Sequence, residues 1–314
     1  MLAIIGIIFP VFAGIGLGYF TVWKGVFSQS DLKVLGKFVL NIALPALMFN
    51  AVAGNSLGDA LVPEWMIAYG IAGLATVGIA YAVFSAQKME PTRRAIGSMG
   101  VYCPNSGYIG YPIMLLAFPS IATQTFAMAV IVENFLTVPL AIILCDLSRG
   151  NDGRKFWQLI GPILWGVLKR PMIIGLLLGI LVAAFQIPVP APALRFMTML
   201  GNATAALALF AIGGSLVGLP IRGNVPVAAQ VVFGKLILHP AMGIGAMALV
   251  ALVGLPDLPS DLRAALIITC ATPMMGIYTI LAQEYGHEGM ASISMLGATI
   301  GSFFTYTALL FWLM

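Results

Sequence analysis

Apolar runs of about 20 residues recur along the whole chain between short polar turns, and this recurrence limits the fold more than any other feature. A helix of that length crosses a hydrocarbon core about 30 Å thick. Hydrophobic residues make up 61% of the 314 residues and charged residues only 8%, whereas soluble domains carry about 25% charged residues. We therefore expect an all-α integral membrane protein that is surrounded by membrane lipid.

The apolar runs predict ten membrane-spanning helices. They lie at Leu2–Thr21, Asp31–Asn50, Glu64–Ala86, Ala95–Phe118, Ala122–Leu147, Pro171–Gln186, Ala193–Leu219, Val225–Val253, Leu262–Tyr285 and Met290–Met314. An odd number of spans in each half gives the halves opposite orientations, as in many secondary transporters. We therefore expect a five-helix repeat at 1–147, a cytoplasmic or interfacial linker at 148–170, and a second five-helix repeat at 171–314.

Glycine positions offer weak support for such a repeat. Gly14 and Gly18 in the first span match Gly175 and Gly179 in the sixth span at one constant offset along the chain. Glycines four residues apart also let helices pack closely, which explains the same pattern without a repeat. The match is therefore suggestive of an inverted repeat and no more.

Basic residues lie mostly on one side of the predicted membrane. The loops after spans one, three, five and seven hold most of the 15 Lys and Arg residues, whereas Arg195 and Arg263 lie on the other side. The positive-inside rule places both termini outside the cytoplasm, and we expect the membrane to be a bacterial cytoplasmic (inner) membrane. The net charge of +4 is scattered singly through the loops, so we expect no nucleic-acid partner.

The fourth predicted span is interrupted by the polar stretch "YCPNSGYIGYP", residues 102–112. Pro104 has no backbone N–H to donate and Gly107 permits unusual backbone angles, so we expect the helix to break there. A break exposes amides at the start of the second half-helix, whose positive end attracts an anion. We therefore expect the amides of Asn105 and Ser106 to hold an anionic substrate.

The ninth predicted span carries a matching interruption in "TCATPMMGIYTI", where Thr272, Pro273 and Met274 complete the expected binding site. Two interrupted helices at corresponding places in two inverted halves indicate a substrate site near the bilayer midplane. The alternative is a pair of packing kinks whose backbone groups are satisfied by neighbouring side chains. Asn41 and Pro45 predict a further local irregularity in the second span, for which we favour a packing role.

Ionisable residues inside the predicted spans are functional candidates, because burying a charge in lipid is costly. Glu133 is a candidate proton carrier or cation ligand, and the alternative is a structural hydrogen bond between helices. Lys235 lies one turn before His239, and its ammonium could pair with Glu133, attract an organic anion, or snorkel to the interface. For His239 we favour packing over titration near neutral pH. Coupling to H⁺, to Na⁺ or to no ion stays open.

The stretches "CPNSGYIGYP" and "ATPMMGIYTILAQEYG" resemble the auxin efflux carrier family, which is related to the bile acid/sodium symporter-like fold. The family includes plant auxin exporters and bacterial carriers assigned to malonate or malate. The resemblance implies ten helices in two inverted repeats, with helices four and nine crossing at the substrate site. It also implies a homodimer in which helices three to five and eight to ten move, elevator-like, against the remaining four.

The resemblance also implies roles for individual residues. By position, Pro104 and Asn105 form the anion-binding pair of the first crossing helix, and Pro273 is the pivot of the second. The chain departs from the plant members because Thr272, and no Asn, precedes Pro273, and because it has no long loop between the halves. The second half of the site and any regulation through that loop are therefore not transferred.

Enzyme signatures give no support for catalysis or for a resident cofactor. The stretch "GNSLG" at Gly54–Gly58 matches a hydrolase nucleophile elbow by its letters, but its place in a short loop does not suit that motif. Walker A and HExxH patterns are absent, and Cys103, Cys145 and Cys270 lack metal-binding spacing. We therefore expect a non-enzymatic transporter of a small organic anion, a mono- or dicarboxylate. An anion channel and a non-transporting signalling or structural protein are the alternatives.

Overall fold

The computed structural model describes residues 2–53, 61–150, 156–219 and 225–313. Within these ranges the regular structure is helical, and β-type pairing is confined to one isolated antiparallel bridge between Pro104 and Met274. The "GNSLG" stretch at Gly54–Gly58 and part of the predicted linker lie outside the described residues. The prediction of an all-α chain is confirmed for the described part.

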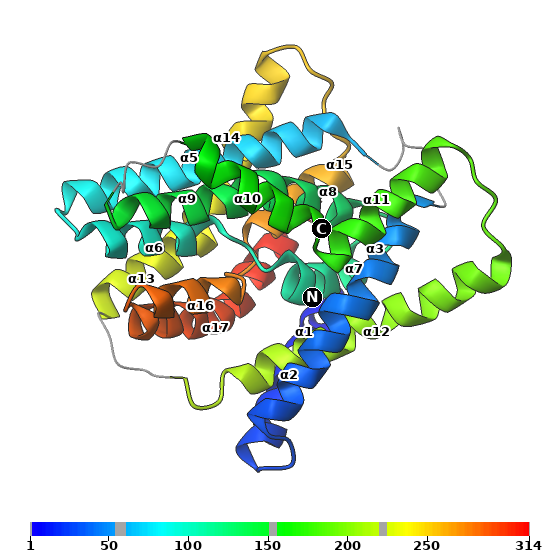
Figure 1. Cartoon of the computed structure of the whole chain (residues 1–314), viewed down its shortest axis with the longest axis horizontal. Helices are drawn as coiled ribbons and strands as arrows, with labels where there is room; N and C mark the ends of the chain where they lie inside the picture. Colours follow the sequence, from blue (N-terminus) through cyan, green and yellow to red (C-terminus); the bar gives the residue numbers. More distant parts are fainter. Residues whose placement is uncertain (1, 54–60, 151–155, 220–224, 314) are drawn as a thin grey trace. The chain divides into compact units, whose positions relative to one another are not determined.

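Figure 1 shows the helices in chain order. They are α1 (Leu2–Trp23), α2 (Gln29–Phe38), η1 (Val39–Ala43), α3 (Leu44–Ala53), α5 (Pro63–Ala86), α6 (Pro91–Tyr102), η2 (Ser106–Gly110), α7 (Tyr111–Ala117), α8 (Ala122–Val132), η3 (Glu133–Thr137), α9 (Val138–Ser148), α10 (Phe156–Leu168), α11 (Pro171–Ala184), α12 (Ala191–Ser215), α13 (Val225–Phe233), η4 (Gly234–Leu238), α14 (His239–Leu252), α15 (Ser260–Cys270), α16 (Ile277–Glu284) and α17 (Glu288–Leu313). The η segments are π-helical turns that continue directly into α-helices.

Seven helices among the described residues are long and apolar enough to cross a membrane. An eighth span is possible if the bent pair Ile160–Leu168 and Pro171–Ala184 crosses as one. The fourth and ninth predicted spans are absent from these seven, because the helix is interrupted in both. The structure therefore supports an integral membrane protein, and the count of ten spans stays a prediction.

Each π turn precedes a proline in the same way. The four turns end two residues before Pro45, Pro112, Pro139 and Pro240. A proline lacks the N–H that an α-helix needs and crowds the carbonyl one turn earlier, and a π turn relieves that crowding with one extra residue. The irregularity expected near Asn41 is therefore present, within η1. π turns are frequent at functional sites, which draws attention to the polar residues inside the other three.

The chain forms two compact units that are discontinuous in sequence. Unit 1 contains residues 1–62, 107–128 and 165–218, and unit 2 contains residues 63–106, 129–164 and 219–314. Neither unit coincides with a predicted five-helix half.

Unit 1 contains two closely packed helix pairs, α1 with α12 and α3 with α11. In each pair the backbones of the two helices come close together at glycine residues. A methyl group added at Gly18 would lie 2.0 Å from the carbonyl oxygen of Phe210, and one added at Gly179 would lie 2.7 Å from that of Phe49. Gly18 and Gly179 occupy matching repeat positions, and Phe49 and Phe210 are separated by the same offset. Gly18 of the first half thus contacts Phe210 of the second, and Gly179 of the second half contacts Phe49 of the first, as expected if the two halves are structurally related.

Unit 2 holds the residues around both interruptions. In it α5 packs against α6 and α14, α6 also packs against α9 and α13, and α13 packs against α17. Glu133 lies in η3 and Lys235 in η4, so both charged candidates lie in π turns of the same unit.

Candidate functional site

The first interruption removes three residues from the helix. α6 ends at Tyr102, Cys103 adopts an extended conformation, and the helix resumes with η2 at Ser106. Pro104 and Asn105 therefore lie outside any helical turn, as the sequence predicted. Asn105 and Ser106 are nevertheless buried, with exposed fractions of 5% and 3%.

The second interruption lies directly against the first. α15 ends at Cys270 and α16 begins at Ile277. The amide of Asn105 donates to the carbonyl of Pro273 at 2.7 Å, and the amide of Met275 donates to the carbonyl of Cys103 at 3.2 Å. The two breaks thus satisfy each other's backbone groups, which water would have to satisfy otherwise.

This pairing corrects one expectation about the anion site. We expected the Asn105 amide to bind the substrate, but it is already bonded to the Pro273 carbonyl. The amides that open the second half-helix begin at Ser106 and Gly107, and the first amides of a helix have no helical carbonyl to bond. Gly107 is the first residue assigned to unit 1, whereas the other predicted site residues belong to unit 2.

A carboxylate cluster stands beside the first break. Glu133 is 4% exposed, and its Oε1 accepts hydrogen bonds from the hydroxyls of Ser106 and Tyr69, the latter at 2.8 Å. Tyr69 comes from α5 and was not predicted, because a tyrosine in an apolar run gives no signal of its partner. The structure therefore brings the first break, η3 and α5 together at one buried charge.

An ammonium cluster stands beside the second break. Lys235 is fully buried, and its Nζ lies 2.7 Å from Nδ1 of His239 and 2.9 Å from the carbonyl oxygen of Cys270, the last residue of α15. An ammonium group only donates, so Nδ1 accepts and the ring proton resides on Nε2. Nε2 of His239 is buried without a hydrogen-bond partner among the described residues. The Nε2–H group of His239 is therefore available to donate a hydrogen bond to an anion.

Tyr69 also connects the two clusters. Its ring stacks on the imidazole of His239, with centroids 6.3 Å apart and an interplanar angle of 21°. The pairing of Glu133 with Lys235 that the sequence allowed is absent: within the described residues no ion pair joins them. Each charge instead binds polar groups at its own break.

Thr272 is held from a different helix. Its hydroxyl accepts a hydrogen bond from the hydroxyl of Tyr306 in α17 at 3.0 Å and donates to the carbonyl of Ile268 at 3.2 Å. Thr272 is fully buried. The prediction placed Thr272 at the second break correctly but missed Tyr306, whose role only the packing of α17 reveals.

The stretch "ATPMMGIYTILAQEYG", which carries part of the family resemblance, ends with Ala-Gln-Glu-Tyr at residues 282–285, and these lie at the far end of α16 in a separate polar cluster. The Tyr285 hydroxyl donates to Asp146 at 2.9 Å, and the guanidinium of Arg149 stacks over its ring at 3.7 Å. The Arg149 guanidinium also donates to the carbonyl of Glu284. This motif therefore ties α16 to the end of α9 and contributes nothing to the candidate site.

A second surface cluster joins the α16–α17 turn to the start of α6. His287 Nε2 lies 2.8 Å from the Thr92 hydroxyl and 3.3 Å from a carboxylate oxygen of Glu90. Burial lowers the pKa of His287 below its usual value despite the opposing effect of Glu90. A hydrogen bond from the Thr92 hydroxyl lowers the pKa of Glu90.

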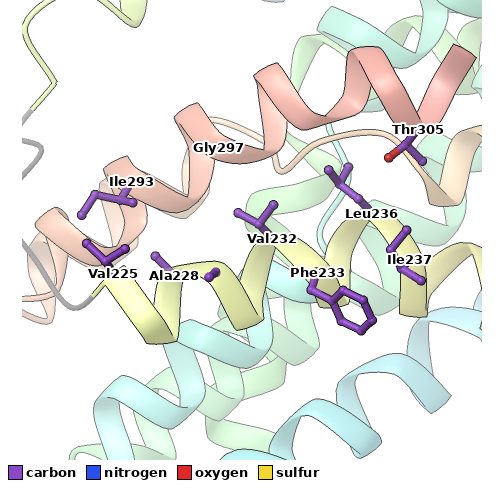
Figure 2. Close-up of a pocket in the computed structure, with 10 residues that line it drawn as sticks. Val225, Ala228, Val232, Phe233, Leu236, Ile237, Ile293, Gly297 and Thr305 are labelled. Carbon is purple, nitrogen blue, oxygen red and sulfur yellow. The ribbon is translucent and has the colours of Figure 1, made fainter.

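A cavity of about 460 Å³ lies between α13–η4 and α17, away from both breaks (Figure 2). Its lining is apolar apart from Thr305, and Phe233 and Ile237 in it are 65% and 49% exposed. The lining offers one hydroxyl group and no charged side chain, so the cavity does not suit an organic anion.

No group of three or more His, Cys, Asp or Glu side chains within the described ranges is placed to hold a metal ion. The candidate site therefore consists of helix ends, hydroxyls and one charge of each sign.

Comparison with known proteins points to a single family. A family model described as "Membrane transport protein" matches residues 3–312. A Rhizobium meliloti (strain 1021) protein named "Putative malonate transporter" is 27% identical, with 99% of this chain and 96% of that protein aligned. "Uncharacterized transporter YfdV" of Escherichia coli (strain K12) is 24% identical over 94% of each chain.

A more distant similarity reaches a larger animal protein. The "Lysosomal cholesterol signaling protein" of Mus musculus is 24% identical over 64% of this chain, but only 24% of the mouse protein is aligned. The shared part is therefore a minor portion of that protein.

Proposed function

Because the chain belongs to the membrane transport protein family, the family of the auxin efflux carriers, we propose that it is a secondary transporter of a small organic anion. The family resemblance that the sequence predicted is confirmed, and so is the prediction that the chain is not an enzyme. The substrate that we propose is a mono- or dicarboxylate. The name of the Rhizobium meliloti relative agrees with this class.

One observation carries the proposal: both helix interruptions meet within unit 2, beside one buried ammonium and one buried carboxylate. In this proposal a substrate carboxylate binds the backbone amide of Ser106, which opens the second half-helix. The Asn105 side chain and Thr272 flank the carboxylate, and Lys235 with Nε2–H of His239 supplies positive potential and a donor. Pro104, Pro273 and Met274 shape the backbone that holds these groups.

The transport cycle that we propose is an elevator movement of a ten-helix, twofold inverted fold. Unit 2 contains spans three, eight, nine and ten, the first half of span four and most of span five, and unit 1 contains spans one, two, six and seven. This division supports most of the moving and static parts that the family resemblance implies, but residues 107–128, from the second half of span four and the start of span five, belong to unit 1. The exchanged contacts of Gly18 and Gly179 support the inverted repeat. A homodimer in a bacterial inner membrane, with both termini outside the cytoplasm, completes the proposal.

Glu133 is the proposed coupling group. A buried carboxylate hydrogen-bonded to the residue that opens the second half-helix responds to a negative substrate bound there, because two negative charges repel strongly at low dielectric. Uptake of one proton by Glu133 removes that repulsion. The proposed coupling ion is therefore H⁺.

Replacement of Asn105 by alanine tests the site. The substitution keeps the backbone amide bonded to Pro273 but removes the side-chain amide from the break. We expect carboxylate uptake into proteoliposomes to fall about 10- to 100-fold, the effect of losing a hydrogen bond to a charged group. The matched control is Asn41→Ala, which removes an exposed asparagine from the π turn η1, away from both breaks. Full transport by Asn105→Ala would remove the proposed site.

The same proteoliposomes separate a carrier from a channel. A carrier shows saturable exchange of internal for external substrate, whereas a channel shows unitary currents in a planar bilayer.

A further inference from the structure

The buried ionisable groups around the two breaks sum to zero charge. In the part of the chain that the structure describes, Glu133 and Lys235 are the buried carboxylate and the buried ammonium, and no other Asp, Glu, Lys or Arg is buried. His239 accepts from Lys235 and is therefore neutral. One negative and one positive charge thus stand beside the proposed binding site.

The hydrogen bonds fit these charge states. Oε1 of Glu133 accepts from two hydroxyl groups, and a carboxylate has only acceptors to offer. Nζ of Lys235 faces the carbonyl oxygen of Cys270 and the acceptor nitrogen of His239, and an ammonium supplies a hydrogen to each. Both side chains are therefore satisfied as ions.

Among the residues that the structure describes, no third charged side chain is buried beside Glu133 or Lys235. The ionisable groups that face Glu133 and Lys235 are Tyr69 of α5, Cys103 after α6, His239 of α14 and Cys270 of α15. All four are neutral in their ordinary forms, apart from a protonated histidine that the Lys235 contact excludes. Protonation of Glu133 can therefore offset one negative charge of a bound substrate. The described ionisable groups around the site include none that could offset a second negative charge.

We infer that the site accepts its substrate as a monoanion: a monocarboxylate, or a dicarboxylate with one of its two acid groups protonated. This inference rests on the proposed function and names the ionic form of the carboxylate. A dianion would leave an uncompensated charge in a buried site, and such charges are strongly destabilising. The protonated acid group of a diacid would instead act as a hydrogen-bond donor.

The test compares malonate with malonamate, its monoamide, by calorimetry on the purified protein between pH 6.5 and 8.5. Malonamate is a monoanion throughout, whereas the monoanion fraction of malonate falls about tenfold per pH unit above its second pKa. We expect the ratio of the two Kd values, malonate over malonamate, to rise about tenfold per pH unit. The ratio cancels any titration of the protein, because both ligands experience it equally.

The possible outcomes distinguish a failure of the monoanion inference from a failure of the proposed carboxylate transport. A ratio that stays constant with pH, with both ligands bound, overturns the monoanion inference and leaves carboxylate transport standing. If neither these two ligands nor any other carboxylate binds at any pH, the proposed function fails and the inference fails with it.

A charge variant gives an independent measurement. Glu133→Gln has the charge of the protonated carboxyl, so its site still offsets one negative charge and no second, and the Kd ratio is expected to rise as steeply as in the unmutated protein. The Kd of malonamate alone should depend less on pH in this variant, because Glu133 no longer has to take up a proton when the anion binds. Glu284→Gln, at an exposed position at the end of α16, is the matched control and is expected to keep the pH dependence of both ligands. A malonamate Kd that depends on pH in Glu133→Gln as strongly as in the unmutated protein would contradict the charge argument. The ratio measured on the unmutated protein decides the question even if Glu133→Gln does not fold.

Discussion

The hydroxyl of Ser106 donates a hydrogen bond to the buried carboxylate of Glu133. Ser106 opens the second half of an interrupted helix, and Glu133 opens a π turn in a different predicted span. A residue that the sequence assigns to an anion site is therefore held by an anion of the protein itself. The hydroxyl stabilises Glu133, and the proposed function uses only the backbone amide of Ser106 for the substrate.

Loss of that hydroxyl is expected to destabilise the protein. Ser106→Ala leaves Oε1 of Glu133 with the Tyr69 hydroxyl alone, and hydrogen bonds to charged groups contribute about 1.5–3 kcal/mol. We expect a lower melting temperature in detergent. The control is Ser302→Ala, a buried serine that donates only to a carbonyl of its own helix, and its change should be smaller. Equal melting temperatures for the two variants would refute a special role for the Ser106 contact.

Proton coupling is expected to disappear in Glu133→Gln. Glutamine keeps acceptor and donor atoms near Ser106 and Tyr69 but cannot bind or release a proton. Carboxylate flux through the variant should therefore no longer respond to an imposed pH gradient in proteoliposomes, although exchange without a gradient continues. Glu284→Gln should respond as the unmutated protein does. A normal response in Glu133→Gln means that another group carries the proton, or that none does.

A methyl group at Gly18 is expected to disrupt unit 1. Gly18→Ala would place Cβ 2.0 Å from the Phe210 carbonyl oxygen, so the α1–α12 pair must separate. Overpacking of this kind costs about 1–3 kcal/mol, and thermal unfolding in detergent measures it. Gly16→Ala, on the same helix, has no atom within 4 Å of the new methyl group and should leave stability unchanged or slightly raised.

Acidification is expected to destabilise the cluster at His287. Burial lowers the pKa of His287 from its ordinary 6.5, so the unfolded chain takes up a proton before the folded one does. Stability should therefore fall as the pH drops below 6.5. The lowered pKa of Glu90 acts in the same direction below its ordinary 4.5, since its contribution is lost as the carboxylate protonates.

Melting temperatures recorded from pH 8 to pH 5.5 check the His287 contribution separately from that of Glu90. His287→Gln keeps a nitrogen donor for Thr92 and removes the titration, so its decline toward pH 5.5 should be shallower. A decline as steep as that of the unmutated protein would assign the pH dependence to other groups.

Much of the chain could be predicted from its apolar periodicity and its prolines. Hydropathy locates the helices, because each must satisfy its backbone within lipid, and Pro104 and Pro273 mark the breaks, because a proline cannot continue the ladder. The one-turn spacing of Lys235 and His239 places them on one face of a helix, and the structure shows the two side chains in contact.

The features that could not be predicted from the sequence depend on packing between segments that are distant in the chain. The Asn105 amide was expected to be available, but a carbonyl from the other break lies 2.7 Å away. Tyr69 and Tyr306 complete the site through hydroxyls whose partners lie on other helices. Each compact unit is made of three separate chain segments. A division of the sequence into a first and a second half therefore does not coincide with these units.

The glycine contacts of unit 1 carry a mechanical consequence. Where main chain lies against main chain, no side chain stands between the helices that could change rotamer and absorb a shift. Such a pair moves as a single rod or comes apart. The α1–α12 and α3–α11 pairs are therefore expected to behave as rigid bodies, and any bending of unit 1 is expected at its other helix contacts.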